Sequence, residues 1–313
     1  MEYRARESHP CERLAVIIFS RSQSFNRPTV SAIRWALFAL LMSTTLPVYS
    51  KVRWQTLPPT PSLPADTVGQ HAMIHGAQLW YAEWGAHNKG VPVLLLHGGT
   101  LNSNYFGLLI PVLVKHGYRV IAMDSRGQGR SARTAGPITY HMMASDVLGL
   151  LDLLHVHQVS LVGWSDGAII GLDLAINHPD RLRRLFAFGA NSDPAGVYAS
   201  AAKAPVVIAF AARAQKEYRQ LSPTPDDWKS SLAVLSKMWL IEPNFTGAQL
   251  RSVRVPTTIA DGEYEEIIKP EDTRYLAATI PHARLVILPD VSHFAILQDP
   301  AAFNVAVLDF LRH

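Results

Sequence analysis

The amino-acid sequence predicts an α/β fold, with a mostly parallel eight-stranded sheet that has helices on both faces. Three observations predict this class. Short apolar runs of strand length alternate with longer segments of helical periodicity over residues 65–313. Hydrophobic residues make up 48% of the 313 residues and charged residues 17%, so the chain can fill a sizeable core. A strand, a sharp turn and a helix are also expected in immediate succession at residues 159–176.

Eight segments are expected to form the strands of this sheet. Several are uninterrupted apolar runs, which are typical of parallel strands buried on both faces. Helical segments separate them, and the last helix closes the chain with Phe303, Val307, Phe310 and Leu311 on one face. The predicted strands lie near His71–Ile74, Gln78–Glu83, Val93–Leu96, Arg119–Ala122, Val159–Val162, Arg183–Phe188, Thr257–Ala260 and Leu285–Leu288.

The turn at residues 163–167 has the sequence Gly-Trp-Ser-Asp-Gly. The pattern Gly-x-Ser-x-Gly between a strand and a helix is typical of a nucleophile elbow, in which Ser165 is held out of the sheet edge with its hydroxyl exposed. Gly163 and Gly167 suit this turn, because side chains at either position would clash. The pattern also arises by chance, so its meaning depends on the residues downstream of it.

An acidic loop and a histidine follow Ser165 at the ends of later strands. The strand Thr257–Ala260 leads into the loop Asp261–Glu266, and the strand Leu285–Leu288 leads to His293. Because the carboxyl ends of parallel strands meet at one edge of a sheet, we expect the loop and His293 beside Ser165. Serine, acid and histidine in this order are what a catalytic triad on this topology requires.

Four segments in the correct order resemble the α/β-hydrolase family. They are the turn His97–Gly99, the loop Asp124–Ser131, the elbow around Ser165 and the segment around His293. The resemblance covers about Asp66–His313. It implies an α/β-hydrolase fold with a small helical lid, in which the serine is the nucleophile and the histidine is the general base.

The triad acid is the least direct assignment. In the family it usually lies three residues after the glycine of the acidic loop, and here that position is Glu265, where aspartate is commoner. Asp261, Glu263 and Glu266 crowd the same loop. Asp193, after the sixth strand, is an outside candidate because some members take the acid from that strand end. We therefore expect Glu265 as the acid and keep the other four as alternatives.

The resemblance also implies how the remaining site residues act. The backbone amides of Gly99 and Asp166 would form an oxyanion hole, and Asp166 would add a favourable charge at a helix start. His97 and the loop Asp124–Ser131 are expected to be structural turns. Trp164 either lines the substrate pocket or packs in the core. The chemistry requires no metal and no organic cofactor.

Residues 191–251, between the sixth strand and the acidic loop, are expected to form the lid over Ser165. The lid segment carries many aromatic and aliphatic side chains. They favour a mainly apolar pocket for the acyl or alcohol group, and ordinary packing of a small lid explains them equally well. These residues are Tyr198, Phe210, Trp228, Met238, Trp239 and Phe245.

Three classes of function fit the sequence. The preferred class is a serine hydrolase that cleaves small, largely apolar esters through an acyl-enzyme intermediate. The second is other serine chemistry on the same scaffold: a C–C bond hydrolase, an aminopeptidase, a lactonase or an acyltransferase. An aminopeptidase would need an acidic grip on the substrate amine, which Glu217, Asp226, Asp227 and Glu242 of the lid could supply. A non-catalytic binding protein is disfavoured by the intact serine, acidic loop and histidine.

The charge balance gives no argument for nucleic acid as a partner. The chain has 29 Lys and Arg against 25 Asp and Glu, a net charge of +4. Eight of the basic and three of the acidic residues lie in residues 1–64, which leaves 21 basic and 22 acidic residues beyond. A nearly neutral domain lacks the electrostatic footprint of a nucleic-acid-binding protein. The expected partner is a small-molecule substrate, and the oligomeric state is not predicted.

Residues 1–64 are predicted to be an extension outside the fold. Arg34 precedes the apolar run Trp35–Met42, as in a signal peptide or, if it is not cleaved, a signal-anchor. The Pro-rich segment Pro58–Pro64 is expected to be a linker. We therefore expect a protein exported to the periplasm or secreted, or one anchored in the membrane by this segment. A cytoplasmic protein with a disordered tail is the alternative.

Overall fold

The computed structural model describes residues 52–313 and confirms the predicted α/β architecture. Eight strands form one sheet in the order β1-β2-β4-β3-β5-β6-β7-β8. The pairs β1–β2 and β2–β4 are antiparallel, and the remaining pairs are parallel. All eight predicted strands are present: β1 (Gly69–Ile74), β2 (Ala77–Trp84), β3 (Val93–Leu96), β4 (Val120–Met123), β5 (Val159–Trp164), β6 (Leu182–Phe188), β7 (Thr257–Gly262) and β8 (Arg284–Leu288).

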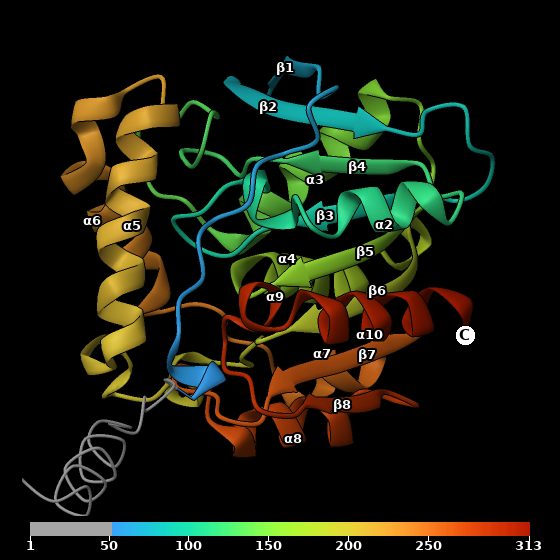
Figure 1. Ribbon diagram of the computed structural model, residues 1–313. Helices are drawn as coiled ribbons and strands as arrows, with labels where there is room; N and C mark the ends of the chain where they lie inside the picture. Colours follow the sequence, from blue (N-terminus) through green and yellow to red (C-terminus); the bar gives the residue numbers. More distant parts are fainter. Residues whose placement is uncertain (1–51) are drawn as a thin grey trace, which may run out of the picture. The chain divides into compact units, whose positions relative to one another are not determined.

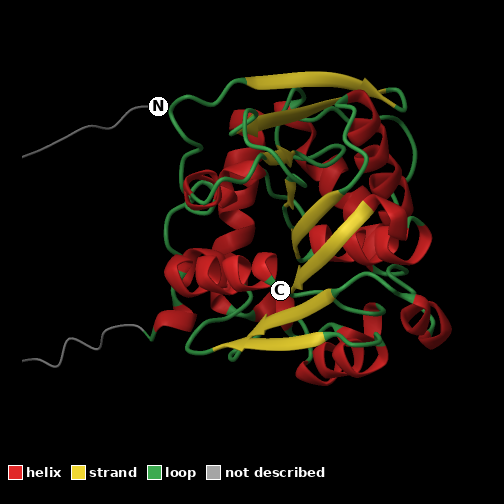
Figure 2. Ribbon diagram, turned by 90° about the vertical axis from the view of Figure 1, so that its right-hand side faces the viewer, coloured by secondary structure: helices red, strands yellow, loops and turns green. Residues whose placement is uncertain are grey.

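Helices cover both faces of the sheet, as the side view in Figure 2 shows. The core of one face includes side chains of α3, α4, α7 and α8, and the core of the other includes those of α2, α9 and α10. The helices are α2 (Ile110–Lys115), α3 (Tyr140–Leu153), α4 (Asp166–Asn177), α5 (Pro205–Leu221), α6 (Trp228–Trp239), α7 (Gly247–Ser252), α8 (Pro270–Thr279), α9 (Ala295–Gln298) and α10 (Pro300–Arg312).

The central strand β3 illustrates why the apolar runs fold in this way. Successive side chains of a strand point to opposite faces, so an uninterrupted apolar run serves two cores at once. Leu94 and Leu96 pack into one hydrophobic cluster, whereas Val93 and Leu95 pack into the other. All four side chains are fully buried. The run therefore stabilises both layers of the domain.

The strand order reverses at β3, and this reversal positions the candidate site. β3 lies between β4 and β5 in the sheet. The strand that follows β3 in sequence, β4, pairs with it on one side, and the later strands β5 to β8 are added on its other side. Open α/β sheets bind ligands outside the carboxyl ends of the strands at such a point. The turn after β3 and the turn after β5 meet there.

The predicted lid lies between β6 and β7 and contains α5, α6 and α7. In Figure 1, α5 and α6 stand side by side at one end of the sheet. Val206 and Phe210 of α5 pack against the core cluster of one face. Leu235 and Met238 of α6 belong to the cluster of the other face. The lid is thus joined to both layers of the domain.

Residues 52–64, which we call the N-terminal strap, correct the expected domain boundary. The sequence predicts a Pro-rich linker up to Pro64, but the compact unit already begins at Lys51. Leu57 and Leu63 pack against the core. In Figure 1 the strap runs, in blue, between α5 and the sheet on its way to β1. The strap is therefore part of the folded domain.

Polar contacts hold the N-terminal strap at both of its sides. Arg213 of α5 donates to the carbonyl oxygen of Leu57 at 2.8 Å. Gln298 of α9 donates to the carbonyl oxygens of Trp54 and Thr56 at 3.0 and 2.9 Å. The ring of Trp54 also stacks on Tyr264 with centroids 4.9 Å apart. The strap thereby connects the lid, the acidic loop and the C-terminal helices.

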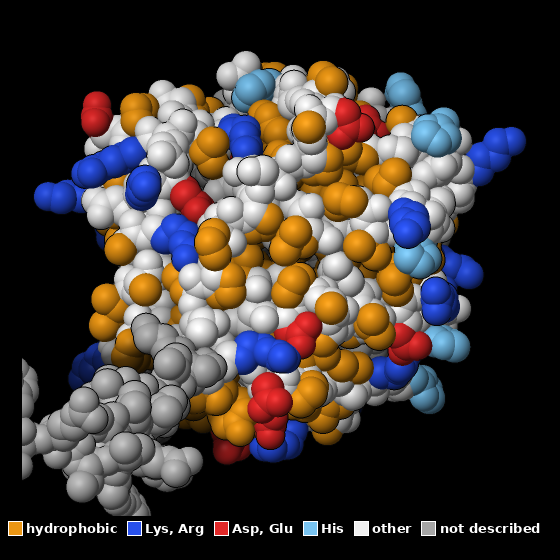
Figure 3. Space-filling view, in the orientation of Figure 1, with side chains coloured by type: hydrophobic (Ala, Val, Ile, Leu, Met, Phe, Trp, Pro, Cys, Tyr) orange, Lys and Arg blue, Asp and Glu red, His pale blue; other side chains and the backbone are white. Residues whose placement is uncertain are grey.

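The predicted signal segment Trp35–Met42 lies outside the described residues. Among residues 52–313, no helix is both long enough and apolar enough to cross a membrane. On the face shown in Figure 3, basic and acidic side chains are interspersed among hydrophobic ones.

Candidate active site

Ser165 lies in a strained turn at the carboxyl end of β5. Its backbone has φ 55° and ψ −119°, a conformation that side-chain-bearing residues rarely adopt. A Cβ atom on Gly163 would lie 2.4 Å from the carbonyl oxygen of Gly167, and one on Gly167 would lie 2.1 Å from that of Leu96. Only glycine fits these two positions. The turn thus holds Ser165 partly exposed at the edge of the sheet.

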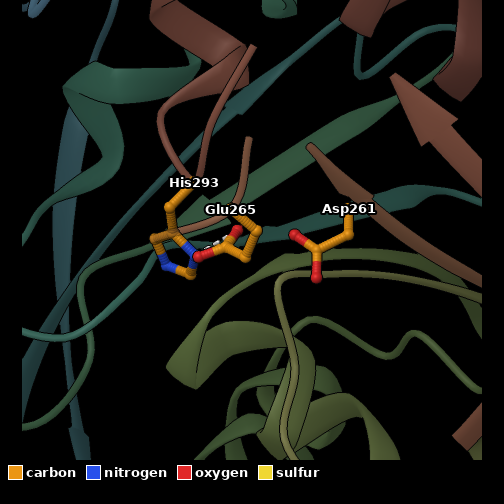
Figure 4. A group of neighbouring side chains, drawn as sticks. All are labelled: Asp261, Glu265 and His293. Atoms are coloured by element: carbon orange, nitrogen blue, oxygen red, sulfur yellow. Dashed lines mark hydrogen bonds and ion pairs between the residues drawn. The ribbon is translucent and has the colours of Figure 1, made fainter. Parts of the chain in front are cut away.

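His293 lies in the loop after β8, with its ring against a carboxylate. Its Nδ1 atom is 3.0 Å from a carboxylate oxygen of Glu265, as Figure 4 shows. Both side chains are buried. The Oε1 atom of this carboxylate accepts hydrogen bonds from the amides of Ile267 and Ile268 at 2.8 and 3.0 Å. These contacts fix the orientation of the Glu265 side chain.

The other four candidate acids have different partners. Glu263 accepts a hydrogen bond from the amide of Asp290, and Asp193 accepts one from the amide of Ala195. Glu266 accepts hydrogen bonds from the Ser292 hydroxyl and from the backbone amide, not the ring, of His293. Asp261 accepts a hydrogen bond from the Thr273 hydroxyl at 2.6 Å. Within the described chain, Glu265 is the acid that is hydrogen-bonded to the imidazole of His293.

Ser165 and His293 contact two consecutive residues at the end of β6. The amide of Ser165 donates to the carbonyl oxygen of Phe188 at 2.8 Å. A Cβ atom on Gly189 would lie 2.6 Å from Cε1 of His293, so the glycine backbone packs directly on the imidazole ring. Gly189 has φ +64°. The end of β6 therefore brings the serine turn and the histidine loop together.

The turn after β3 lies against Ser165. A Cβ atom on Gly98 would be 3.0 Å from Cβ of Ser165. Within residues 52–313 the amide of Gly99 makes no backbone hydrogen bond, and the amide of Asp166 is among the first of a helix, which have no intrahelical acceptor. His97 is buried, and its Nε2 accepts a hydrogen bond from the amide of Ser125. It supports the turn, as expected.

The Asp166 side chain has a role that the sequence does not predict. From the sequence, only its amide and its charge at a helix start are expected to matter. Instead the buried carboxylate accepts hydrogen bonds from the Tyr140 hydroxyl at 2.8 Å and from Nε1 of Trp239 at 3.1 Å. Burial raises the pKa of Asp166 to about 6. No spacing in the sequence pairs Tyr140 or Trp239 with the elbow, so only the structure reveals them.

Trp164 packs below the site and is 1% exposed. Its ring lies 5.6 Å from that of Tyr105 and 6.0 Å from that of His293, measured between centroids. Its Nε1 atom has no hydrogen-bond partner among the described residues. Of the two interpretations of Trp164, the structure favours packing beside the histidine.

Burial shifts the protonation of both partners in the His293–Glu265 contact. It lowers the pKa of His293, because the charged imidazolium loses hydration. It raises the pKa of Glu265 to about 7, although hydrogen bonds from neighbouring groups counteract the shift. The imidazole therefore favours its neutral form, which can accept a proton.

A surface cavity of about 360 Å³ reaches Glu265 and Glu266 from the side of Tyr198 and Lys203.

The loop Asp124–Ser131 is a scaffold beneath the turn after β3, as expected. Asp124 accepts hydrogen bonds from the amides of Ser103 and Arg130 at 2.7 and 2.9 Å. Arg126 is 1% exposed and forms an ion pair with the equally buried Asp146 of α3. This buried pair ties the loop to the helix layer.

Two of the four lid acids are engaged in contacts within the chain. Glu217 accepts hydrogen bonds from Thr60 of the N-terminal strap at 2.6 Å and from Asn102 at 3.2 Å. Glu242 accepts one from the amide of Tyr140 at 2.9 Å. Asp226 and Asp227 are exposed at the start of α6. These contacts leave Glu217 and Glu242 less suited to bind a substrate amine.

Comparison with known proteins agrees with this fold and these motifs. The family model of the alpha/beta hydrolase fold matches residues 91–226. The chain is 30% identical over 222 residues to RutD of Caulobacter sp. (strain K31), a proposed carbamate hydrolase, covering 62% of this chain and 81% of that one. It is 27% identical to the serine hydrolase BPHL of Mus musculus, covering 91% of this chain and 98% of that one.

A solved structure gives the same result for the fold. The enol-lactonase from Burkholderia xenovorans LB400 superposes with a TM-score of 0.63 at 24% identity, covering 78% of this chain and all of that one. The chain belongs to the α/β-hydrolase family and is a hydrolase.

Proposed function

We propose that this protein is a serine hydrolase that cleaves small, largely apolar esters through an acyl-enzyme intermediate. The single observation that carries the proposal is the 3.0 Å contact between Glu265 and the imidazole of His293, at the sheet edge where Ser165 is held in its strained turn. A nucleophile, a base and a group that orients the base are the three parts that such a mechanism needs.

Each part of the proposed triad has a defined task. A serine hydroxyl is a poor nucleophile at neutral pH, so His293 accepts the proton of Ser165 as the hydroxyl attacks the ester carbonyl. The lowered pKa of His293 keeps the ring neutral and ready for this step. Glu265 holds Nδ1 protonated, which leaves Nε2 free to act, and it stabilises the imidazolium that forms.

The tetrahedral intermediate would be stabilised by the amides of Gly99 and Asp166. One such donor is worth about 2.7–4 kcal/mol of the barrier. The protonated His293 then donates its proton to the leaving alcohol. Water, activated by the same histidine, attacks the acyl-enzyme and releases the acid, which returns Ser165 to its starting state.

Apolar side chains support an uncharged substrate. Phe210 of the lid packs on Phe294 with ring centroids 4.9 Å apart and lies 6.5 Å from Tyr105, next to the ring of Trp164. These rings belong to, or pack against, the core cluster beside the imidazole of His293, and apolar surroundings of this kind favour apolar acyl or alcohol groups. The mouse relative is named a serine hydrolase, which agrees with a serine nucleophile. The Caulobacter relative is named for carbamate hydrolysis, so carbamates are a substrate class to test. Other serine chemistry on this fold is the alternative, and a non-catalytic binder is the least supported.

Labelling and substitution test the proposed residues. A fluorophosphonate probe should label the wild-type protein, and Ser165→Ala should abolish both labelling and ester hydrolysis. Glu265→Gln should lower kcat by several orders of magnitude because the amide cannot stabilise the imidazolium. Glu266→Gln and Asp193→Asn are the matched controls and should cost far less. Full labelling of the alanine variant, or a larger loss in either control, would refute the assignment.

A substrate panel tests the reaction class. p-Nitrophenyl esters of graded chain length should be hydrolysed faster than an aminoacyl anilide or an aryl carbamate. Preference for the anilide would point to an aminopeptidase, and preference for the carbamate to a carbamate hydrolase. Saturation with an ester at micromolar to millimolar concentration is expected of a physiological substrate class.

We also propose that the protein is exported or anchored by its N-terminal segment. The support is the sequence pattern of Arg34 followed by the apolar run Trp35–Met42. N-terminal sequencing of protein from the native host should find a mature chain that begins between Ser43 and Val52. A cytosolic chain that begins at Met1 would overturn this localisation without affecting the catalytic proposal.

A further inference from the structure

A second buried carboxyl group lies beside the proposed triad. Asp261 is the penultimate residue of β7, four positions before Glu265, and it is 2% exposed. One carboxyl oxygen of Asp261, one of Glu265 and a ring nitrogen of His293 lie within 4.8 Å of one another. Figure 4 shows the Asp261 carboxyl group directed toward Glu265, on the side away from the histidine. The triad mechanism gives this group no role.

The two carboxyl groups approach each other, with one oxygen of each in the same 4.8 Å cluster. Two carboxylates have only acceptor atoms, so a hydrogen bond between them would require a proton on one of them. Two adjacent carboxylates in a buried site also repel each other too strongly to ionise together. A single proton on one of the two carboxyl groups would relieve this repulsion.

The surroundings of each carboxyl group decide which one keeps the proton. Glu265 accepts hydrogen bonds from two amides and also faces His293, and these contacts stabilise its ionised form. Asp261 accepts hydrogen bonds from the hydroxyl of Thr273 and from the amide of Gly262. Glu265 and His293 are the titratable groups that face Asp261 in the described part of the chain, and Thr273 of α8 is neutral. Among these residues, the one cation that could offset a charge on Asp261 is a protonated His293, and burial lowers the pKa of that ring so that it favours the neutral form.

We propose that Asp261 is a positioning residue that keeps its proton at neutral pH and donates it in a hydrogen bond to Glu265, so that the pair presents one negative charge to His293. The inference rests on the proposed function of Glu265 as the triad acid. Burial raises the pKa of Asp261 well above its usual range, and the neighbouring carboxylate raises it further, in agreement with this geometry. The donated hydrogen bond in turn lowers the pKa of Glu265.

The role predicts opposite results for two substitutions of the same residue. Asp261→Ala removes the donor, so the pH midpoint of the acidic limb of kcat/KM should rise by about one unit or more. Activity at pH 7 should then fall about fivefold or more, and it should recover at alkaline pH. Asp261→Asn places an amide donor where the acid O–H lay and should rescue both the midpoint and the activity. A merely structural role would lower the activity equally at every pH.

Infrared spectroscopy tests the proton without relying on activity. The difference spectrum between the wild type and Asp261→Asn at neutral pH should contain the carbonyl stretching band of a protonated carboxylic acid. Absence of that band would overturn the proposal, as would an asparagine variant that shifts the pH profile as the alanine variant does. Loss of activity at all pH values in Asp261→Asn, with activity retained in Glu265→Gln, would make Asp261 itself the triad acid. Absence of any hydrolysis or labelling in the wild type would instead contradict the proposed function. The infrared spectrum would then still show whether Asp261 is protonated.

Discussion

Trp239 donates the hydrogen of its Nε1 atom to the carboxylate of Asp166, the residue that follows Ser165. Trp239 is the last residue of the lid helix α6. A Cβ atom on Gly99 would lie 2.5 Å from Cζ2 of the same indole, so the ring also covers the turn that offers the proposed oxyanion amide. One side chain therefore connects α6 to both residues whose amides form the proposed oxyanion hole.

Trp239→Phe should weaken this connection. The substitution leaves the buried Asp166 carboxylate with Tyr140 as its remaining side-chain donor, and an unsatisfied buried acceptor costs about 1–3 kcal/mol. We expect a lower free energy of unfolding and a lower kcat/KM for esters. Trp228→Phe is the control, because Trp228 packs on Tyr218 without bonding to the elbow. Equal loss of activity in both variants would show that the hydrogen bond is not the cause.

Gly189→Ala should impair catalysis more than folding. The new Cβ atom would collide with the His293 ring, which must move, and a positive φ adds strain. Misplacement of a catalytic base by about 1 Å costs on the order of a hundredfold in rate. Gly117→Ala is matched in backbone strain, with φ +84° and no atom within 4 Å of the new Cβ. Similar kcat values for the two variants would argue against close packing of Gly189 on His293.

The pH dependence of kcat/KM should have an acidic limb with a midpoint near 7. The proposed mechanism needs an ionised Glu265, whose pKa is raised to about 7, so activity rises as the pH passes upward through this value. The pKa of His293 is lowered, so the imidazole is already neutral there and does not limit the rate. Ester hydrolysis by Ser165→Ala at each pH provides the blank. A midpoint below about 5 would mean that Glu265 ionises as an ordinary exposed glutamate does.

Arg126→Met should unfold the protein at a much lower denaturant concentration. It leaves the Asp146 carboxylate buried without its cation, and breaking a buried ion pair in this way costs about 3–5 kcal/mol. Urea titration followed by circular dichroism measures the loss. Arg284→Met removes an exposed ion pair and should leave the midpoint almost unchanged. A small effect of the Arg126 substitution would mean that water reaches Asp146.

Removal of the N-terminal strap should destabilise the lid. A chain that begins at Asp66 loses the contacts of Arg213 and Gln298 and uncovers the core surface beneath Leu57 and Leu63. We expect a melting temperature lower by about 5 °C or more than that of a chain that begins at Val52. Limited proteolysis should then cut the lid segment first. Identical melting curves would show that the strap contributes nothing to stability.

The parts of the molecule that the sequence predicts are those set by local pattern. Strands such as β3 and β5 are recognisable because burial on both faces demands a continuous apolar run. The turn at Ser165 is recognisable because its geometry demands glycine at two fixed positions. Position along the chain also singles out Glu265 among its neighbours, although only the structure gives it a contact with His293.

The features that the sequence does not predict all depend on tertiary contacts. Trp239 and Asp166 are 73 residues apart, and no periodicity relates them. Asp261 and Glu265 are close in sequence, but their mutual contact depends on the path of the loop after β7. The sequence predicts a linker where the N-terminal strap lies, because a proline-rich segment has the same composition whether it is free or packed.

The composition of the N-terminal strap has a consequence for the entropy of its docking. Pro58, Pro59, Pro61 and Pro64 fix φ at four of its thirteen positions, from Val52 to Pro64. Such a segment is already extended and stiff before it docks, so ordering it loses less chain entropy than ordering a flexible segment of equal length. A few hydrogen bonds and two leucine side chains can then hold it in place. A glycine-rich replacement of the same length would offer the same backbone carbonyls and bind more weakly.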